Sequence, residues 1–249
     1  MERERLDKFL ASQLNKSRKE VKTAIHRGTV TVNGQTAQDP GQWIEPGEDA
    51  VTFEGQAVFY RKFLYLLMNK PKGVLSACED RHANTVLDLV PESMRRKGLF
   101  PVGRLDKDTT GLLLLTDDGD FAHRLLSPKN EIYKIYIARL DGEVPPAAVA
   151  AFAQGVTLAD GTVCRKAFLE PLPGCRAQVR ICEGRFHQIK RMFGTVGLGV
   201  EELQRIAVGD LRLPDDLREG ECIELERVAP RFVEKVKSGV NFFAYRQLN

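Results

Sequence analysis

The chain has 249 residues, of which 43% are hydrophobic and 29% are charged. This is the composition of an ordinary globular protein, and it excludes a disordered or fibrous chain. At about 100–200 residues per domain, the length predicts one or two domains. No apolar run approaches the roughly 20 residues of a membrane helix, and the charged start Met1–Arg5 precedes no apolar segment, so we expect neither a membrane span nor a signal peptide. Lys and Arg exceed Asp and Glu by only 37 − 34 = 3, so net charge indicates no partner.

The cysteines and histidines are few and dispersed. There are five cysteines, an odd number, and four histidines, none of which forms a His-x-x-x-His pair. We therefore expect free thiols in a reducing cytoplasm, with neither a disulfide framework nor a structural metal site. The cysteines are Cys78, Cys164, Cys175, Cys182 and Cys222.

The first sixty residues are predicted to form a small unit. Leu6, Phe9 and Leu10 recur at helical spacing. Ser17 and Glu20 match a capping box at the start of a second helix, and Gly28 stands where a left-handed residue would end it.

A short sheet follows these helices. Thr29–Val32 alternates as a strand does, and Asn33-Gly34 is a strong hairpin turn signal. Residues 1–27 contain eight Lys or Arg against four Asp or Glu, and part of this charge recurs every fourth residue on the second helix. Two interpretations stay open for that basic face, a solvated surface and an RNA-binding surface.

A resemblance favours RNA. The motifs Arg5-Leu-Asp-Lys8, Ser17-Arg18, Val30-x-Val-Asn-Gly34 and Pro46-Gly47, in this order, resemble the S4 RNA-binding domain over about residues 2–58. The resemblance implies an S4-like RNA-binding domain over residues 1–60.

From about residue 61 the chain mixes β-rich runs with helical stretches and frequent turns. Strands are predicted at 65–68, 112–116, 133–140, 177–181 and 223–226, and helices at 85–89, 120–126, 146–154 and 187–196. The spacing lacks the regularity of a doubly wound fold, so we predict an α+β architecture with a mostly antiparallel mixed sheet. This domain spans residues 61–238 and leaves a tail, 239–249, of unknown role.

The segment Gly103–Gly119 is the most informative for chemistry. Asp106 lies between Arg104 and Lys107, ahead of a short apolar strand. A carboxylate in an electropositive setting stays ionised and can act as a nucleophile or base. The residues alone also fit a loop aspartate in an ordinary salt bridge.

A second cluster is Glu183–Met192. Its basic and polar residues follow Gly184 at a predicted helix start, where backbone N–H groups favour anions. An exposed basic turn is the alternative. In Tyr133–Tyr136, aromatic side chains on a strand indicate a core position more often than a base-stacking surface.

Together these motifs resemble the pseudouridine synthases that carry an N-terminal S4 domain. The match rests on Lys70-Pro-Lys-Gly73, Gly103-Arg-Leu-Asp106, Lys134-x-Tyr136 and Glu183–Met192, in order. The motifs Asp108–Gly111, Thr116–Gly119 and Ser127-Pro128 resemble most the enzymes that modify small-subunit (16S) rRNA. Ile135 departs from the pattern, which has a hydroxyl residue there.

The resemblance implies a catalytic role for three residues. Asp106 would act on the nucleotide, Tyr136 would stack on the flipped-out base, and Lys190 would neutralise a buried Asp106. RNA contacts are expected from Arg104 and from further residues of both domains: Arg5, Lys8, Arg18, Lys19, Lys22, Lys70, Lys72, Arg185, His187, Gln188 and Arg191.

The sequence thus predicts a cofactor-free RNA pseudouridine synthase that isomerises a uridine in 16S rRNA. We expect a cytoplasmic monomer whose partners are rRNA or ribosomal assembly intermediates, with no metal and no membrane. Two alternatives remain: the same reaction on 23S rRNA, and a non-catalytic rRNA-binding assembly factor. A two-carboxylate glycosidase is disfavoured because no second positioned acid is evident.

Overall fold

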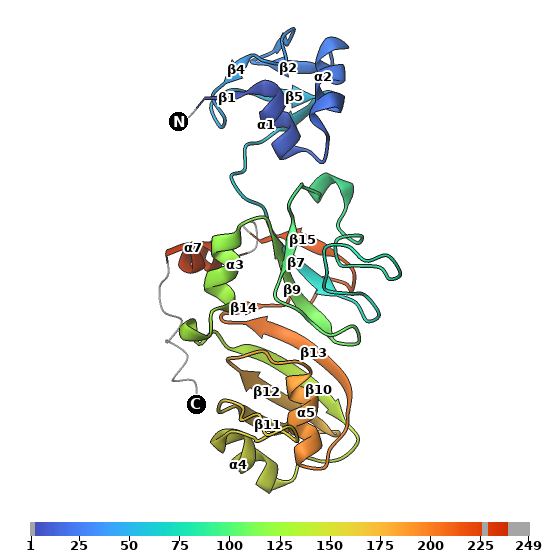
Figure 1. Ribbon diagram of the computed structural model, residues 1–249, viewed down its shortest axis with the longest axis vertical. Helices are drawn as coiled ribbons and strands as arrows, with labels where there is room; N and C mark the ends of the chain where they lie inside the picture. Colours follow the sequence, from blue (N-terminus) through green and yellow to red (C-terminus); the bar gives the residue numbers. More distant parts are fainter. Residues whose placement is uncertain (1–2, 226–228, 239–249) are drawn as a thin grey trace. The chain divides into compact units, whose positions relative to one another are not determined.

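The computed structural model describes residues 3–225 and 229–238, and the predicted tail, 239–249, lies outside this range. The chain divides into two compact units (Figure 1). The first contains residues 1–64 together with 90–99, and the second contains residues 65–89 and those from 100 onward. Each unit is described separately below.

The first unit begins with two helices, α1 (Leu6–Gln13) and α2 (Arg18–His26). The predicted capping box is confirmed: the Glu20 N–H donates to the Ser17 hydroxyl, and the Ser17 N–H donates to the Glu20 carboxylate. Gly28 follows α2 with φ +73°, as predicted for a left-handed residue after the helix. The helices bury the apolar positions that predicted them, including Leu6, Phe9 and Leu10.

Six short strands complete the first unit. Asn33 and Gly34 both have positive φ, 52° and 79°, which confirms the predicted hairpin turn. The order β3-β2-β5-β6 forms an antiparallel sheet, and β1 pairs with β4. The strands are β1 (Glu4–Arg5), β2 (Val30–Val32), β3 (Gln35–Thr36), β4 (Trp43–Ile44), β5 (Val51–Phe53) and β6 (Gln56–Val58).

Residues 90–99 also belong to the first unit and carry the 3₁₀-helix η1 (Glu92–Met94). The Arg96 guanidinium donates to the carbonyl oxygens of Arg61 and Lys62 at 2.9 and 3.2 Å. Asn15 donates to the Glu92 carboxylate at 3.1 Å. These bonds tie the segment to residues far from it in the sequence.

A large sheet forms the second unit. Its main path is β11-β12-β10-β13-β9-β7-β15, with β14 beside β13 and β8 beside β9. Among the described strand pairs of this sheet only β13–β9 is parallel, so the mostly antiparallel mixed sheet is confirmed. The strands are β7 (Tyr65–Lys70), β8 (Phe100–Val102), β9 (Thr110–Thr116), β10 (Lys134–Leu140), β11 (Phe168–Leu172), β12 (Arg176–Ile181), β13 (Val200–Val208), β14 (Leu211–Arg212) and β15 (Cys222–Glu224).

Three of the four helices predicted for the second unit are confirmed, the one at 85–89 is wrong, and α7 and η2 were not predicted. At 85–89 Thr85 forms a β-bridge with Leu75 and residues 86–89 form turns rather than a helix, and the Asp88 carboxylate accepts hydrogen bonds from the backbone N–H and hydroxyl of Thr85. The helix α3 packs against α7 and β8, and α4 packs against β11. The helices are α3 (Gly119–Leu126), η2 (Pro128–Asn130), α4 (Pro146–Gln154), α5 (Gln188–Thr195) and α7 (Pro230–Ser238).

At Gly111, β9 lies close against the Arg205 backbone of β13. It has φ +100°, and a Cβ atom there would lie 2.3 Å from the Arg205 carbonyl oxygen. Only glycine fits this contact, which joins the two halves of the sheet.

Within residues 3–225 and 229–238, no helix has the length and apolar character needed to span a membrane. The same residues contain no cluster of three or more His, Cys, Asp or Glu side chains placed to hold a metal ion. All five cysteines are free, as predicted.

Candidate active site

Asp106 lies in the loop between β8 and β9, and the backbone of this loop is held on both sides. The Thr109 N–H donates to the Asp106 carbonyl oxygen at 3.1 Å and closes a turn. The Ser76 hydroxyl donates to the Leu105 carbonyl oxygen and accepts from the Leu105 N–H, at 2.9 and 3.1 Å. The residue before Asp106 is therefore fixed through both of its backbone polar groups.

Lys70, the last residue of β7, also holds the backbone of this loop. Its fully buried ammonium donates to the carbonyl oxygens of Pro71, Thr109 and Lys107 at 3.0, 3.0 and 3.3 Å. The prediction that Lys70 contacts RNA is wrong, because its three donors are used inside the protein. Burial lowers the pKa of Lys70 to about 8, partly offset by the charges of Asp108 and Asp106.

Gly73 explains the rest of the Lys70-Pro-Lys-Gly73 motif. Its N–H donates to the Lys107 carbonyl oxygen at 2.7 Å, and its φ of +88° suits glycine. The motif thus positions the Asp106 loop from the neighbouring strand.

The Asp106 carboxylate is partly accessible, with 29% of its side chain exposed. His187 Nε2 lies 3.6 Å from Asp106 Oδ1. His187 is the residue before α5 and has a left-handed backbone with φ +48°. A left-handed histidine is uncommon, and here it directs the imidazole towards the carboxylate.

Lys190 pairs with a different carboxylate from the one predicted. Its ammonium lies 2.5 Å from Asp108 Oδ2, and among the described residues Lys190 forms no ion pair with Asp106. The hydrogen bond from Lys190 lowers the pKa of Asp108. The prediction that Lys190 pairs with Asp106 is wrong, because the loop carries two aspartates two residues apart and it is Asp108 that contacts Lys190 of α5.

Tyr136 is buried in β10, where it is 7% exposed. Its cross-strand partner on β13 is Arg205, Arg205 is paired with Gly111 on β9, and Gly111 is paired with Lys70 on β7. Cross-strand partners share a face of the sheet. The sheet therefore places Tyr136 in the same lateral row as the lysine that supports the Asp106 loop.

Two buried cations lie beside Tyr136, and neither was predicted as a site residue. Arg205 is 5% exposed and donates from Nε to the Leu112 carbonyl oxygen at 2.7 Å. Lys134 is 9% exposed, and the described residues give its ammonium neither a hydrogen bond nor an ion pair. Burial, followed by repulsion from Arg205, lowers the pKa of Lys134 to about 8. Lys134 stands in the Lys134-x-Tyr136 motif, whereas Arg205 lies in β13, where no strand was predicted.

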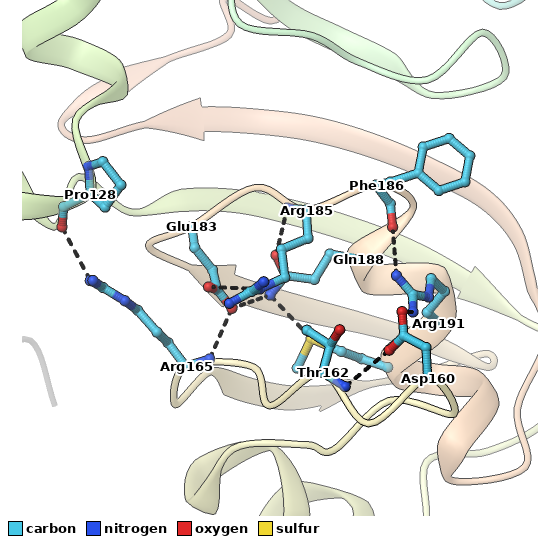
Figure 2. Close-up of polar contacts among 10 residues, drawn as sticks. Pro128, Asp160, Thr162, Arg165, Glu183, Arg185, Phe186, Gln188 and Arg191 are labelled. Atoms are coloured by element: carbon cyan, nitrogen blue, oxygen red, sulfur yellow. Dashed lines mark hydrogen bonds and ion pairs between the residues drawn. The ribbon is translucent and has the colours of Figure 1, made fainter.

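The turn before α5 is held by a polar network centred on Glu183 (Figure 2). The Glu183 carboxylate accepts from the Gln188 amide at 2.7 Å and from the Arg165 N–H at 2.8 Å. The Gln188 amide oxygen also accepts from the Arg185 N–H at 3.0 Å. Gln188 is 4% exposed and closes this turn, so the prediction that it contacts RNA is wrong.

The remaining basic residues of the second unit that were predicted to contact RNA differ in whether they already have an ion-pair partner. Arg104 and Lys72 are exposed and make no described hydrogen bond or ion pair. Arg185 pairs with Glu183 at 3.3 Å, and Arg191 pairs with Asp160. Of these four predicted contacts, Arg104 and Lys72 are the cations that no described ion pair or hydrogen bond engages.

The basic face of the first unit is also divided. Arg5 and Lys22 both face the buried carboxylate of Asp7, at 3.1 and 3.9 Å, and Lys8 pairs with Glu4 at 2.8 Å. Arg18 and Lys19 are exposed and form none of the described ion pairs. A surface depression of about 490 Å³ has three cations in its lining, Lys19 together with Lys16 and Arg27.

Comparison with known families accounts for both units. Residues 4–49 match the S4 domain, and residues 64–195 match the RNA pseudouridylate synthase family, more than half of the chain. The chain belongs to the RNA pseudouridylate synthase family. The pseudouridine synthase fold predicted from the motifs is thereby confirmed, together with the N-terminal S4 domain.

Relatives of this pseudouridine synthase cover most of its length. It is 43% identical over 226 residues to the uncharacterized RNA pseudouridine synthase YtzG of Bacillus subtilis, covering 89% of this chain and 94% of the relative. It is 38% identical over 219 residues to ribosomal small subunit pseudouridine synthase A of Escherichia coli, covering 87% and 94%. A crystal structure of a pseudouridylate synthase aligns with TM-score 0.65 and 35% identity, over 93% of this chain and 99% of that one.

Proposed function

We propose that this protein isomerises a uridine of small-subunit (16S) rRNA to pseudouridine, with Asp106 as the catalytic carboxylate. Support for the substrate comes from relatives named ribosomal small subunit pseudouridine synthase A, which are 38–40% identical over at least 92% of their own length. The S4 unit supports an RNA substrate.

The observation that carries the catalytic role is the loop around Asp106. Leu105 is fixed by Ser76, and Lys107 and Thr109 are fixed by Lys70, while the Asp106 side chain stays partly accessible. Fixed backbone with an accessible carboxylate is the arrangement that a catalytic group needs.

The reaction detaches uracil from C1′ of the ribose, rotates it and rejoins it through C5. Asp106 would act in one of two ways, by attacking the nucleotide or by removing the C2′ proton. In either case the target base must leave the RNA stack to reach the carboxylate. Tyr136 would stack on the detached base, and Lys190 would offset the charge of Asp108 near the reacting centre.

The first unit would bind rRNA outside the target site. Its uncommitted cations, Arg18 and Lys19 among them, suit phosphate contacts. We propose that the enzyme works as a cytoplasmic monomer on rRNA or on an assembling small subunit.

The test is Asp106→Asn, which keeps the shape of the side chain but removes its nucleophilic and basic character. We expect no pseudouridine in 16S rRNA treated with the variant, with RNA affinity within a few-fold of wild type. Turnover above about one per cent of wild type, a barrier change below about 2.7 kcal/mol, would exclude Asp106. Glu79→Gln, at an exposed carboxylate outside the loop, is the matched control and should keep full activity.

The substrate is tested separately by mapping pseudouridine in rRNA from cells with and without the protein. Loss of one 16S position supports the proposal. Loss of a 23S position would assign the same chemistry to the large subunit. Unchanged rRNA modification with altered subunit assembly would indicate a non-catalytic assembly factor.

A further inference from the structure

Phe186 is the most exposed large hydrophobic side chain among the described residues, at 74% exposed. Its ring stacks on the imidazole of His187, with centroids 3.9 Å apart and planes 16° apart. In Figure 2 the ring points away from the polar network around Glu183. Covering an exposed phenyl face with an apolar or aromatic ligand is favourable.

The backbone that carries this ring is fixed. The Phe186 carbonyl oxygen accepts from Arg191 Nη1 at 3.4 Å, and the other Arg191 nitrogen binds Asp160 (Figure 2). On the other side, the Arg185 N–H and carbonyl oxygen are both bonded to Gln188, at 3.0 and 3.2 Å. The exposed ring is therefore presented by a braced turn, which reduces the ordering cost of binding.

The stacked pair also lies next to the reacting group. His187, which forms one layer of the stack, places Nε2 3.6 Å from Asp106 Oδ1. A strand that brings its nucleotide to Asp106 would therefore have a neighbouring nucleotide close to the Phe186–His187 stack. Nucleobases that have left a helix stack on aromatic side chains irrespective of their identity.

We propose that the Phe186–His187 pair is a stacking subsite for an unpaired nucleobase adjacent to the target uridine. The ligand class is a single-stranded RNA base, distinct from the uracil that Tyr136 would contact. The proposal rests on the proposed function, because it places the neighbouring base by reference to Asp106.

The kinetic test uses 16S rRNA transcribed in vitro, three variants of Phe186 and one control variant. Phe186→Ala should raise KM about tenfold, with kcat within about twofold, while Phe186→Tyr and Phe186→Trp should stay near wild type. Phe168→Ala is the matched control, because Phe168 is 51% exposed but its ring already contacts Arg180 and Tyr133. A KM for Phe186→Ala within twofold of wild type would overturn the proposal.

A binding test separates this proposal from catalysis. The chain has one tryptophan, Trp43, so Phe186→Trp combined with Trp43→Phe leaves a single reporter. Addition of 16S rRNA should quench its fluorescence, whereas a reporter at Phe168→Trp in the same background should be unaffected. Quenching without any pseudouridine formation would support the subsite and reject the proposed activity. Normal activity without quenching would do the reverse.

Discussion

The Lys190 ammonium lies 2.5 Å from the carboxylate of Asp108, two residues beyond Asp106. The pair places a neutralised aspartate beside the candidate catalytic one. Under the proposed function, Lys190 would act on Asp106 indirectly, by pairing with a like charge in its neighbourhood.

This relationship predicts a rescue. Lys190→Met should lower kcat at least about tenfold at neutral pH, about 1.4 kcal/mol, because Asp108 then keeps an unpaired charge near Asp106. The hydrogen bond from Lys190 lowers the pKa of Asp108, so the pair forms above the ordinary carboxylate pKa and is lost as pH falls through the depressed value. Adding Asp108→Asn to Lys190→Met should restore kcat to within about threefold of wild type. A double variant as slow as Lys190→Met alone would show that Lys190 acts on the RNA or on Asp106.

Lys134 predicts a gain of stability. Burial lowers its pKa to about 8, from 10.5, so the folded protein binds its proton less tightly than the unfolded chain does. Lys134→Met should therefore raise the free energy of unfolding at pH 7 by about 1–3 kcal/mol. As pH rises from about 8 to 10.5 the wild type loses this cost, and the difference between the two proteins should shrink. Denaturant unfolding at pH 7 and 10 measures both values.

The control for this prediction is Lys166→Met, at an exposed position in the same unit. It should change the free energy of unfolding by less than about 0.5 kcal/mol at either pH. A destabilised Lys134→Met protein at pH 7 would mean that the ammonium has a stabilising partner.

The S4 unit offers a charge-matched test of its RNA surface. Replacing Lys16, Lys19 and Arg27 by Ala should reduce the slope of log affinity against log salt by about 2–3, because each lost phosphate contact contributes about 0.7–0.9. The control replaces Arg3, Lys8 and Lys22 by Ala. This triple substitution removes the same charge, but these three cations face Glu45, Glu4 and Asp7. Filter binding of 16S rRNA at several salt concentrations gives both slopes. Equal changes in the two triple variants would show that net charge, rather than this surface, binds RNA.

Gly111→Ala should destabilise the second unit by more than about 3 kcal/mol. The new Cβ would lie 2.3 Å from the Arg205 carbonyl oxygen, and the backbone stands at φ +100°. Gly220→Ala is the control, because φ is +86° there but nothing lies within 4 Å of the added atom. Gly220→Ala introduces the backbone strain without a clash and should lower the free energy of unfolding by about 1–2 kcal/mol. Thermal unfolding of both variants separates the clash from the strain.

Local signals in the sequence predicted local structure well. The bounds of α4, the capping box of α2 and the Asn33-Gly34 turn are confirmed, because each depends on residues a few positions apart. The strand β13 was not predicted, since Glu201, Glu202 and Arg205 interrupt its apolar pattern. The parallel contact of β13 with β9 determines its place, and that contact is distant in sequence.

The site shows the same division. The motifs identified the Asp106 loop and the turn before α5, which the structure brings to within 3.6 Å through His187. They did not predict that Lys70 is buried or that Gln188 closes a turn, because lysine and glutamine are mostly exposed in proteins. The choice of Lys190 between two aspartates is made by tertiary geometry alone.

The anchoring of the Asp106 loop by Lys70 and Ser76 also bears on how the catalytic centre forms. Its anchors are the end of β7 and the segment after it, and β7 lies inside the large sheet between β9 and β15. We therefore expect that the Asp106 loop does not unfold separately from the sheet, and that the loop and the sheet form in the same cooperative step. Native-state hydrogen exchange should reflect this, with the Leu105 amide opening only by the global unfolding of the second unit.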